Sequence, residues 1–203
     1  LVDGSFARAL DLRGADDAVG AINAAFLSDG WFVDVAAGTE LEQPVELQNV
    51  HAGGQAHVRF AVRVGTGAKA TIIERQTGEG AALVSSVSHL TVGDGAEITW
   101  VIVQDQPDRT SYLGQFNASI GKDARLTLFV MNVGGKLVRQ EIIVAASGER
   151  SSFKLRGVNL LGAENHTDVT MVLDHVAPHT SSTEVVRNVV TDKARGVFQG
   201  RIN

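Results

Sequence analysis

The stretch LTVGDGAEITWV, residues 90–101, is the middle one of three segments with a common pattern, and the other two are VRVGTGAKATII at 62–73 and ASIGKDARLTLFV at 118–130. Each segment runs from an apolar pair through a glycine, a polar residue, Gly or Asp, and an alanine into a second apolar run. The first glycine of the pattern recurs at an interval of 28 residues, at Gly65, Gly93 and Gly121. A period of this length is typical of solenoids, propellers and repeat arrays.

The interval selects among those architectures. A propeller blade needs about 40 residues and four strands, whereas 28 residues hold two strands and two turns, which is one coil of a β-helix. No six-residue recurrence of an aliphatic residue and Gly is present, which disfavours the left-handed hexapeptide type. We therefore predict an all-β fold, a right-handed parallel β-helix with coils of roughly 28 residues. Weaker copies of the turn, AASGERSSFKL around Gly148 and VVTDKARGVF near Lys193, extend the repeat.

Alternation along the strands indicates which side chains face the core. In the segment 57–65, one side carries Val58, Phe60, Val62 and Val64, and the other carries His57, Arg59 and Arg63. In EITWVIVQ (97–104) and RLTLFVMNV (125–133) both sides are apolar, which predicts strands covered on both faces. The repeat interval predicts that one set of core residues stacks on another in the next coil, namely Ile98, Trp100 and Ile102 on Leu126, Leu128 and Val130.

The N-terminal segment has a different period. Asp16 and Asp17 are followed by Val19, Ile22 and Phe26 at helical spacing, and Asp29-Gly30 is a stop signal, so we predict a short helix within 16–28. The predicted organisation is an N-terminal segment at 1–30 with this helix and a β-helix core at 31–203. Because the ends of a solenoid expose apolar surface and strand edges, we expect the helix to cap the N-terminal end.

Composition excludes several classes of function. A net charge of −5 leaves no basic footprint for nucleic acid. The apolar runs are far shorter than the roughly 20 residues that span a membrane, and no leader opens the chain. With no cysteine there is no disulfide, no thiolate nucleophile and no cysteine-ligated metal or cluster. A cytoplasmic location is the resulting expectation.

The densest group of metal-binding residue types is in ENHTDVTMVLDHVAPHT, residues 164–180, with His166, Asp168, Asp174, His175 and His179. Pro178 lies between His175 and His179, so that pair is not held on one helix face as zinc-protease histidines are. We therefore interpret these side chains as turn and surface groups and expect no metal site.

Catalytic patterns are equally sparse. The run Ser85-Ser86-Val87-Ser88-His89 lacks a nucleophile elbow, and no phosphate-binding loop is present. A β-helix enzyme acting on polysaccharide would need acid pairs and an aromatic platform, whereas Asp94, Asp123 and Asp192 sit at turn positions that favour Asp anyway. We expect no catalytic residue and no cofactor-binding residue, with the polysaccharide enzyme or a purely structural solenoid as the alternatives.

The closing segment, DHVAPHTSSTEVVRNVVTDKARGVFQGRI, carries a specific pattern. It has a histidine, Thr/Ser-x-Ser, a basic residue, and then Asp-Lys-x-Arg-x-Val-Phe-x-Gly-x-Ile. The residues that make it up are His175, Thr180, Ser182, Arg187, Asp192, Lys193, Arg195, Val197, Phe198, Gly200 and Ile202. This segment resembles the signature of the SufB/SufD family of iron–sulfur cluster assembly proteins, and the form ARGVFQGRI is most like its SufD branch. Upstream, INAAF with Asp29-Gly30, and Pro44-Val45-Glu46-Leu47, are also similar to the family.

The resemblance implies a right-handed β-helix and a non-catalytic scaffold subunit of a cytoplasmic complex. Its implied partners are a SufB-like paralogue and a SufC-like ABC-type ATPase, the latter through a helical C-terminal region that follows the core. It implies that an iron–sulfur cluster is assembled transiently on the complex and not bound by this chain alone. We expect a core truncated before that helical region. We also expect a homodimer in isolation, through strand pairing around 183–202, because open strand edges recruit further strands.

Overall fold

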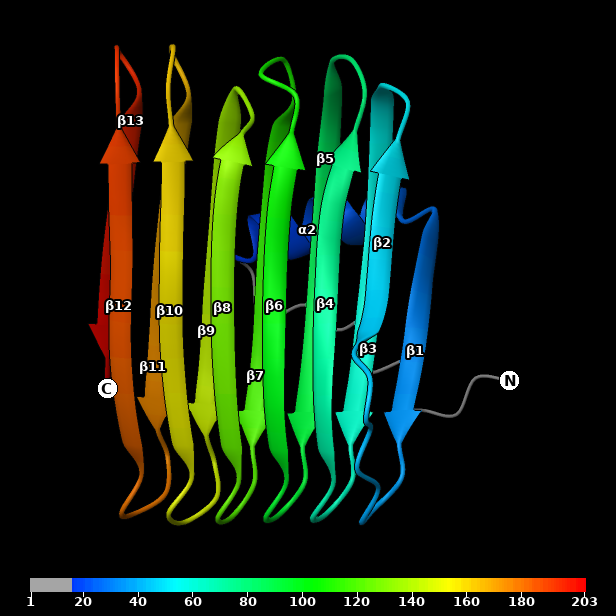
Figure 1. The fold of residues 1–203 in the computed structure, drawn as a ribbon, viewed down its shortest axis with the longest axis vertical. Helices are drawn as coiled ribbons and strands as arrows, with labels where there is room; N and C mark the ends of the chain where they lie inside the picture. The colour runs from blue at the N-terminus through cyan, green and yellow to red at the C-terminus, as the bar shows by residue number, and fades with distance from the viewer. Residues whose placement is uncertain (1–15) are drawn as a thin grey trace.

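The computed structural model describes residues 16–203 and consists of two parallel β-sheets that face each other (Figure 1). The seven-stranded sheet contains, in spatial order, β1 (Asp29–Val35), β3 (Gly54–Val64), β5 (Ala82–Val92), β7 (Ser111–Ile120), β9 (Leu137–Ala146), β11 (His166–His175) and β13 (Arg195–Ile202). The six-stranded sheet contains β2 (Val45–His51), β4 (Lys69–Gly78), β6 (Glu97–Gln106), β8 (Arg125–Gly134), β10 (Ser152–Leu161) and β12 (Ser181–Val190). Consecutive strands alternate between the sheets, so each coil contributes one strand to each.

The winding is right-handed. In Figure 1 the strands of the six-stranded sheet run upward in front, those of the seven-stranded sheet run downward behind, and the chain advances from right to left. All the strand pairs are parallel. The predicted right-handed parallel β-helix is therefore confirmed.

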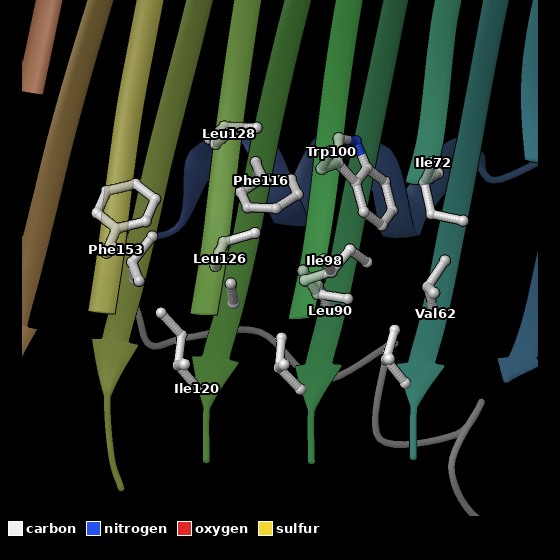
Figure 2. Close-up of a cluster of buried hydrophobic side chains, with 14 of the residues drawn as sticks. Val62, Ile72, Leu90, Ile98, Trp100, Phe116, Ile120, Leu126, Leu128 and Phe153 are labelled. Atoms are coloured by element: carbon white, nitrogen blue, oxygen red, sulfur yellow. The ribbon is translucent and has the colours of Figure 1, made fainter. Parts of the chain in front are cut away.

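The predicted register between successive coils is also confirmed. In the pairing of β6 with β8, the partners are Ile98 with Leu126, Trp100 with Leu128, and Ile102 with Val130. Figure 2 shows Ile98, Trp100, Leu126 and Leu128 between the two sheets, where the Trp100 ring meets Phe116 of β7 edge-on with ring centroids 5.1 Å apart. All of them are buried. The core is thus a continuous stack that runs through the coils.

The repeated turn explains the glycines of the sequence pattern. Its third residue has positive φ, +66° at Gly95 and 57° at Asp123, a conformation that favours Gly and is tolerated by Asp. Its first residue lies against the turn of the preceding coil, since a Cβ on Gly93 would come 2.7 Å from the Thr66 nitrogen. The alanine that closes the turn, Ala96 in this copy, is fully buried. Stacking of turns therefore determines the 28-residue pattern.

One of the two weaker copies does not continue the series. The copy around Gly148 joins β9 to β10, on the same edge of the solenoid as Gly93 and Gly121. The copy near Lys193 joins β12 to β13, on the opposite edge, where it stacks on the turn at Ala163. The same turn geometry, with positive φ, occurs at Asp123 on one edge and at Ala163 and Asp192 on the other. The turn pattern alone therefore does not distinguish the edges.

The outward faces of β6 and β8 are not fully covered. Val101, Phe129 and Met131 are half-buried, and no described element lies over them. The prediction that these strands are covered on both faces is wrong for the described residues. Apolar residues on the outer face pack against one another along the sheet, which is sufficient to favour them at these positions.

The helix of the described residues, α2 (Ala18–Phe26), lies within the predicted range but not in the predicted place. It runs across the outer face of the seven-stranded sheet and contacts β3, β5 and β7 (Figure 1), so the prediction that it caps the N-terminal end is wrong. Residues 1–15 of the predicted N-terminal segment lie outside the described residues. In the part of the chain that the structure describes, no helix has the length and apolarity needed to cross a membrane.

The interior also contains a row of amide side chains. Equivalent positions on successive strands of the six-stranded sheet carry Asn49, Gln76, Gln104, Asn132, Asn159 and Asn188. Asn49 donates to Gln76 at 2.8 Å, Asn132 donates to Asn159 at 2.8 Å, and Asn159 donates to Asn188 at 2.6 Å. Such side-chain bonds link coils inside the core, where a buried amide without a partner would be costly.

Glu74 is a buried carboxylate within this interior. It accepts hydrogen bonds from Gln76 Nε2 at 2.8 Å, Ser86 Oγ at 3.0 Å, Ser88 Oγ at 2.6 Å and Trp100 Nε1 at 3.2 Å. Burial raises the pKa of Glu74, and the four donors oppose that effect. The nearby Glu74 carboxylate and above all burial raise the pKa of the Tyr112 hydroxyl well above its usual value.

Candidate functional site

The candidate site is the C-terminal coil, defined as residues 175–203, which contains every residue of the closing signature. Its strands β12 and β13 are the last of their sheets: β12 pairs with β10 and β13 pairs with β11. Within the described residues, the other edge of each strand has no strand beside it. In the described residues, the coil therefore forms one edge of each sheet.

His175 and Thr180 lie at the start of the coil, and their side chains contact each other. The His175 Nδ1 atom lies 2.6 Å from the Thr180 hydroxyl, which also donates to the Ala177 carbonyl at 3.2 Å. The His175 backbone nitrogen donates to the Asn203 carbonyl at 3.0 Å. These contacts shape the turn from β11 into β12 and join it to the last residue. The histidine and the threonine of the signature thus act together on backbone geometry.

The core-facing side chains of the coil are in register with the interior side chains of earlier coils, but they are partly exposed to solvent. Ser182 of β12 pairs with Phe153 of β10, and Phe198 of β13 pairs with Val169 of β11. Phe198 is 37% exposed and Ile202 is 53% exposed, although they occupy positions that are buried in earlier coils. The end of the solenoid therefore offers apolar side chains between the two open strand edges.

The Asp-Lys pair of the signature forms the turn between β12 and β13. Asp192 has a φ of 57°, and its carboxylate accepts from the Ala163 backbone nitrogen at 3.1 Å. The Lys193 nitrogen donates to the Ala163 carbonyl at 2.9 Å, and the Arg195 nitrogen donates to the Asn165 carbonyl at 2.8 Å. Asp192 therefore combines a left-handed backbone conformation with a bond to the preceding turn, a combination available to Asp and Asn. These residues position the last strand.

Two signature positions have no such structural task. Arg187 lies on the outward face of β12, is exposed, and pairs in register with Val158. The atoms nearest to a Cβ on Gly200 would be those of Met171 and Phe198, at ordinary contact distances of 3.6 and 3.8 Å, so no contact among the described residues requires glycine there. Residues that the chain's own fold does not explain are candidates for contact with another molecule.

The predicted metal-ligand types do not converge. His166 and His175 lie at opposite ends of β11, which places them about 30 Å apart along an extended strand. Asp168 is paired with Arg139, Asp174 accepts from the Asn203 amide at 2.7 Å, and His179 occupies a turn with a φ of 59°. Among the residues that the structure describes, no three His, Cys, Asp or Glu side chains are grouped to hold a metal ion.

The acidic turn residues also have structural partners. Asp94 accepts from the Lys122 backbone nitrogen at 2.8 Å. Asp123 is bound by Arg150 through two bonds of 2.7 and 2.8 Å, and this hydrogen bonding lowers the pKa of the Asp123 carboxyl. Asp192 lies on the opposite edge of the solenoid from both. These carboxylates do not form an acid pair of the kind that glycoside cleavage requires.

Sequence reasoning missed the polar contacts between coils. Lys69 lies 3.4 Å from Glu40 on one side and pairs in register with Glu97 on the other, and Glu97 lies 3.4 Å from Arg125. The signal was present, because opposite charges recur at the repeat interval. The buried contacts of Asn23 and Arg59 had no such signal, because they join the helix to strands that no sequence period relates to it.

Comparisons with known proteins agree with the closing signature. The family model described as "SUF system FeS cluster assembly, SufBD core domain" matches residues 47–203. A SufBD family protein from Synechocystis is 23% identical over 89% of this chain and 43% of its own length. SufD of Escherichia coli is 21% identical over 84% of this chain and 42% of its own length, and SufB of Bacillus subtilis is 24% identical over 93% and 42%.

The chain thus spans about two-fifths of the length of these relatives. The family model covers most of the chain, including the whole β-helix from β3 onward and the C-terminal coil. The relatives include proteins named for each of the two branches. On this match, the chain belongs to the SufBD family of iron–sulfur cluster assembly proteins, of which it carries the core domain.

Proposed function

We propose that this chain is the core of a SufD-like, non-catalytic scaffold subunit that works in iron–sulfur cluster assembly. The observation that carries the proposal is the C-terminal coil, where two open strand edges flank exposed Phe198 and Ile202 and coincide with the family signature. A subunit that pairs through strand edges gains main-chain hydrogen bonds along the whole edge. Its task is therefore to hold a partner in register.

The partner proposed for this surface is a SufB-like paralogue. SufB and SufD of the relatives are similar to this same core, so a paralogue has a comparable β-helix end to offer. The core and the paralogue would then meet coil to coil, with Phe198 and Ile202 covered by the contact. A SufC-like ATPase completes the proposed complex, which works in the cytoplasm, and docks outside the β-helix.

Assignment to the SufD branch is supported by two features of the sequence. The closing form ARGVFQGRI resembles the SufD version of the signature, and the 203 residues contain no cysteine. A cluster needs thiolate or comparable ligands, so the cluster is proposed as cargo of the whole complex, built with ligands from elsewhere. The chain itself carries no phosphate-binding loop for ATP hydrolysis.

When the paralogue is absent, a second copy of the chain is the proposed occupant. Two C-terminal coils related by a two-fold axis would make an isologous contact by antiparallel pairing within 183–202. Such a contact should bury about 1,200–2,000 Å² if it is specific. The homodimer and the heterodimer then use the same surface and exclude each other.

The test uses a double variant of the apolar end, Phe198→Asp with Ile202→Asp, beside the matched control Val50→Asp. Val50 is also exposed, at 65%, but lies on β2 at the other end of the solenoid. The tagged chain is produced with a SufB-like paralogue and a SufC-like ATPase, and capture is measured. Sedimentation equilibrium of each purified variant measures self-association.

We expect the double variant to lose at least about tenfold in capture and in self-association, since a charge in an apolar contact core costs several kcal/mol. The control should keep both. A folded double variant, judged by an unchanged β-type circular dichroism spectrum, that captures the paralogue as well as the wild type would overturn the proposed surface. Turnover of a polysaccharide by the chain would favour the enzyme alternative.

A further inference from the structure

The contact between α2 and the solenoid is polar, unlike the rest of the core. Of the nine residues of the helix, the buried ones are Val19, Gly20 and Asn23. Its larger apolar side chains remain partly in solvent, with Ile22 36% exposed and Phe26 59% exposed. A helix normally turns its apolar stripe to the protein. This helix is therefore held by specific hydrogen bonds more than by apolar burial.

Asn23 is the centre of those bonds. Its Nδ2 atom donates to the Val58 carbonyl at 3.0 Å and to Ser85 Oγ at 2.9 Å, which ties the helix to both β3 and β5. Its Oδ1 atom accepts from Arg59 Nε at 2.6 Å. Arg59, which is 1% exposed, also donates to the Gly20 carbonyl at 3.0 Å. The first turn is tied in the same way, since Asp17 caps Gly20 and accepts from Gln115 of β7 at 2.6 Å.

His57 lies beneath the last turn of the helix and connects to the same bonds. It is 3% exposed, and its ring lies 5.4 Å from the ring of Phe26. Its Nδ1 atom is 2.8 Å from Ser85 Oγ, and its Nε2 atom is 3.3 Å from Gln55 Oε1. Because Ser85 Oγ accepts from Asn23, its one hydrogen is free to be donated to Nδ1. That arrangement needs a neutral imidazole with its proton on Nε2.

The helix depends on this docking. A nine-residue helix is too short to be stable alone in water. A segment with few buried apolar contacts belongs to the low end of local stability and opens before the rest of the fold. Loss of the Asn23 bonds would therefore release and unfold α2 while the two sheets remain, because their strands pair without it.

We propose that α2 is a releasable latch on the outer face of the seven-stranded sheet and that protonation of His57 opens it. A proton on Nδ1 removes the acceptor for the Ser85 hydroxyl. It also places a second cation beneath the helix beside Arg59. The other charged or titratable groups that flank His57 on these elements are Asp17 before α2, Asp29 and Asp34 on β1, Arg63 on β3 and His89 on β5, and Asp34 is paired with Arg63. Asp17 is already engaged with Gln115 and the Gly20 nitrogen, and Asp29 accepts from the Gly30 nitrogen at 2.7 Å.

The direction of the pH effect follows from burial, which lowers the pKa of docked His57 below the ordinary value of 6.5. The charged form therefore prefers the released helix. Docking is complete above about pH 6.5 and is lost as the pH falls from there toward the docked pKa. Within that window the opening equilibrium should rise about tenfold per pH unit for one proton.

The experiment is hydrogen–deuterium exchange of the full chain, read by mass spectrometry on peptides covering 18–26, at pH 7.5 and pH 5.5 with correction for intrinsic rates. We expect the protection of this segment to fall in acid, by up to about tenfold for one proton, while β6 and β8 keep theirs. His57→Gln should abolish the pH response. The matched control His166→Gln, at an outward histidine on β11, should keep it.

Asn23→Ala provides a second test, which does not depend on the protonation of His57. It should release α2 at both pH values and leave the β-type circular dichroism spectrum unchanged. Two results would overturn the proposal: protection of 18–26 that is the same at both pH values in the wild type, or a response that persists in His57→Gln. This inference is independent of the proposed scaffold function.

Discussion

The middle coils and the C-terminal coil follow the same local pattern and differ in what lies beside them. Leu128 on β8 has β6 on one side and β10 on the other and is 0% exposed. Ile202 on β13 faces the same interior, has β11 on one side, and is 53% exposed. Burial in a solenoid is thus supplied by the neighbouring coil and not by the residue's own strand. A core position in the last described coil is therefore exposed where the same position in a middle coil is buried.

The most direct test of this difference is to replace each of the two side chains by alanine. Leu128→Ala should lower the free energy of unfolding by about 2–5 kcal/mol, because a fully buried leucine leaves a cavity in a closed stack. Ile202→Ala should cost less than about 1 kcal/mol, since its surface is already largely in water. Urea denaturation followed by circular dichroism measures both. Equal losses would mean that the last coil is covered in solution, and a loss below about 0.5 kcal/mol at Leu128 would contradict the stack.

A second comparison concerns two carboxylates that face the interior. Glu74 on β4 pairs with Ile102 and is fully enclosed, whereas Glu184 on β12 pairs with Leu155 and is half-buried at the open end. Because burial raises the pKa of Glu74, its charged form is disfavoured in the folded state. Its contribution to stability is therefore fully present below the ordinary value of 4.5 and is lost as the pH rises through the folded-state pKa.

This difference predicts a pH dependence. Between pH 4.5 and the folded-state pKa of Glu74, the stability contributed by this group should fall by about 1.4 kcal/mol per pH unit. The measurement is the unfolding free energy of the wild type and Glu74→Gln from pH 4 to pH 8, and the slope in the difference reports Glu74. Glu184→Gln retains Glu74 and should retain the wild-type slope. A difference between wild type and Glu74→Gln that does not vary with pH would show that the four donors cancel the effect of burial.

The fold could be predicted from the sequence because it is a periodic object. The glycines at 65, 93 and 121 and the alternation around Trp100 are signals that recur in the sequence. The pattern of one coil therefore predicts the geometry of the next. The β-helix coil and the register of β6 on β8 follow from these signals, whereas the helix near the N-terminus was predicted from the helical spacing of Val19, Ile22 and Phe26. One turn, the copy near Lys193, was wrongly counted in the same series, because the same kind of turn occurs on both edges of the solenoid.

The contacts that could not be predicted are those between residues that are not separated by the repeat interval. His57 and Arg59 point outward, as alternation predicts, but α2 covers them. The position of α2 depends on hydrogen bonds such as those from Asn23 to two strands. Glu74 sits at a core position where a repeat would place an aliphatic residue, as it does at Ile102. Among the signature residues, the sequence indicated that His175 and Thr180 matter but not that they touch. Such pairings depend on three-dimensional packing that a spacing rule does not contain.

The smallest effect expected concerns exposed charges at the turns, on the two edges of the solenoid. On the middle coils Lys69 lies between Glu40 and Glu97, at 3.4 Å from the first and in register with the second, whereas Lys193 of the C-terminal coil lies 3.9 Å from Glu164 on one side. Lys69→Glu would place three acids in one column and should cost about 0.5–1 kcal/mol at low salt, the range for exposed charge pairs. Lys193→Glu should cost less, because it has one neighbour. Unfolding in 1 M NaCl, where the screening length is about 3 Å, should remove both effects. A loss at Lys69 that persists in high salt would mean that strand packing, not charge, sets its contribution, and the contrast between coils would then rest on burial alone.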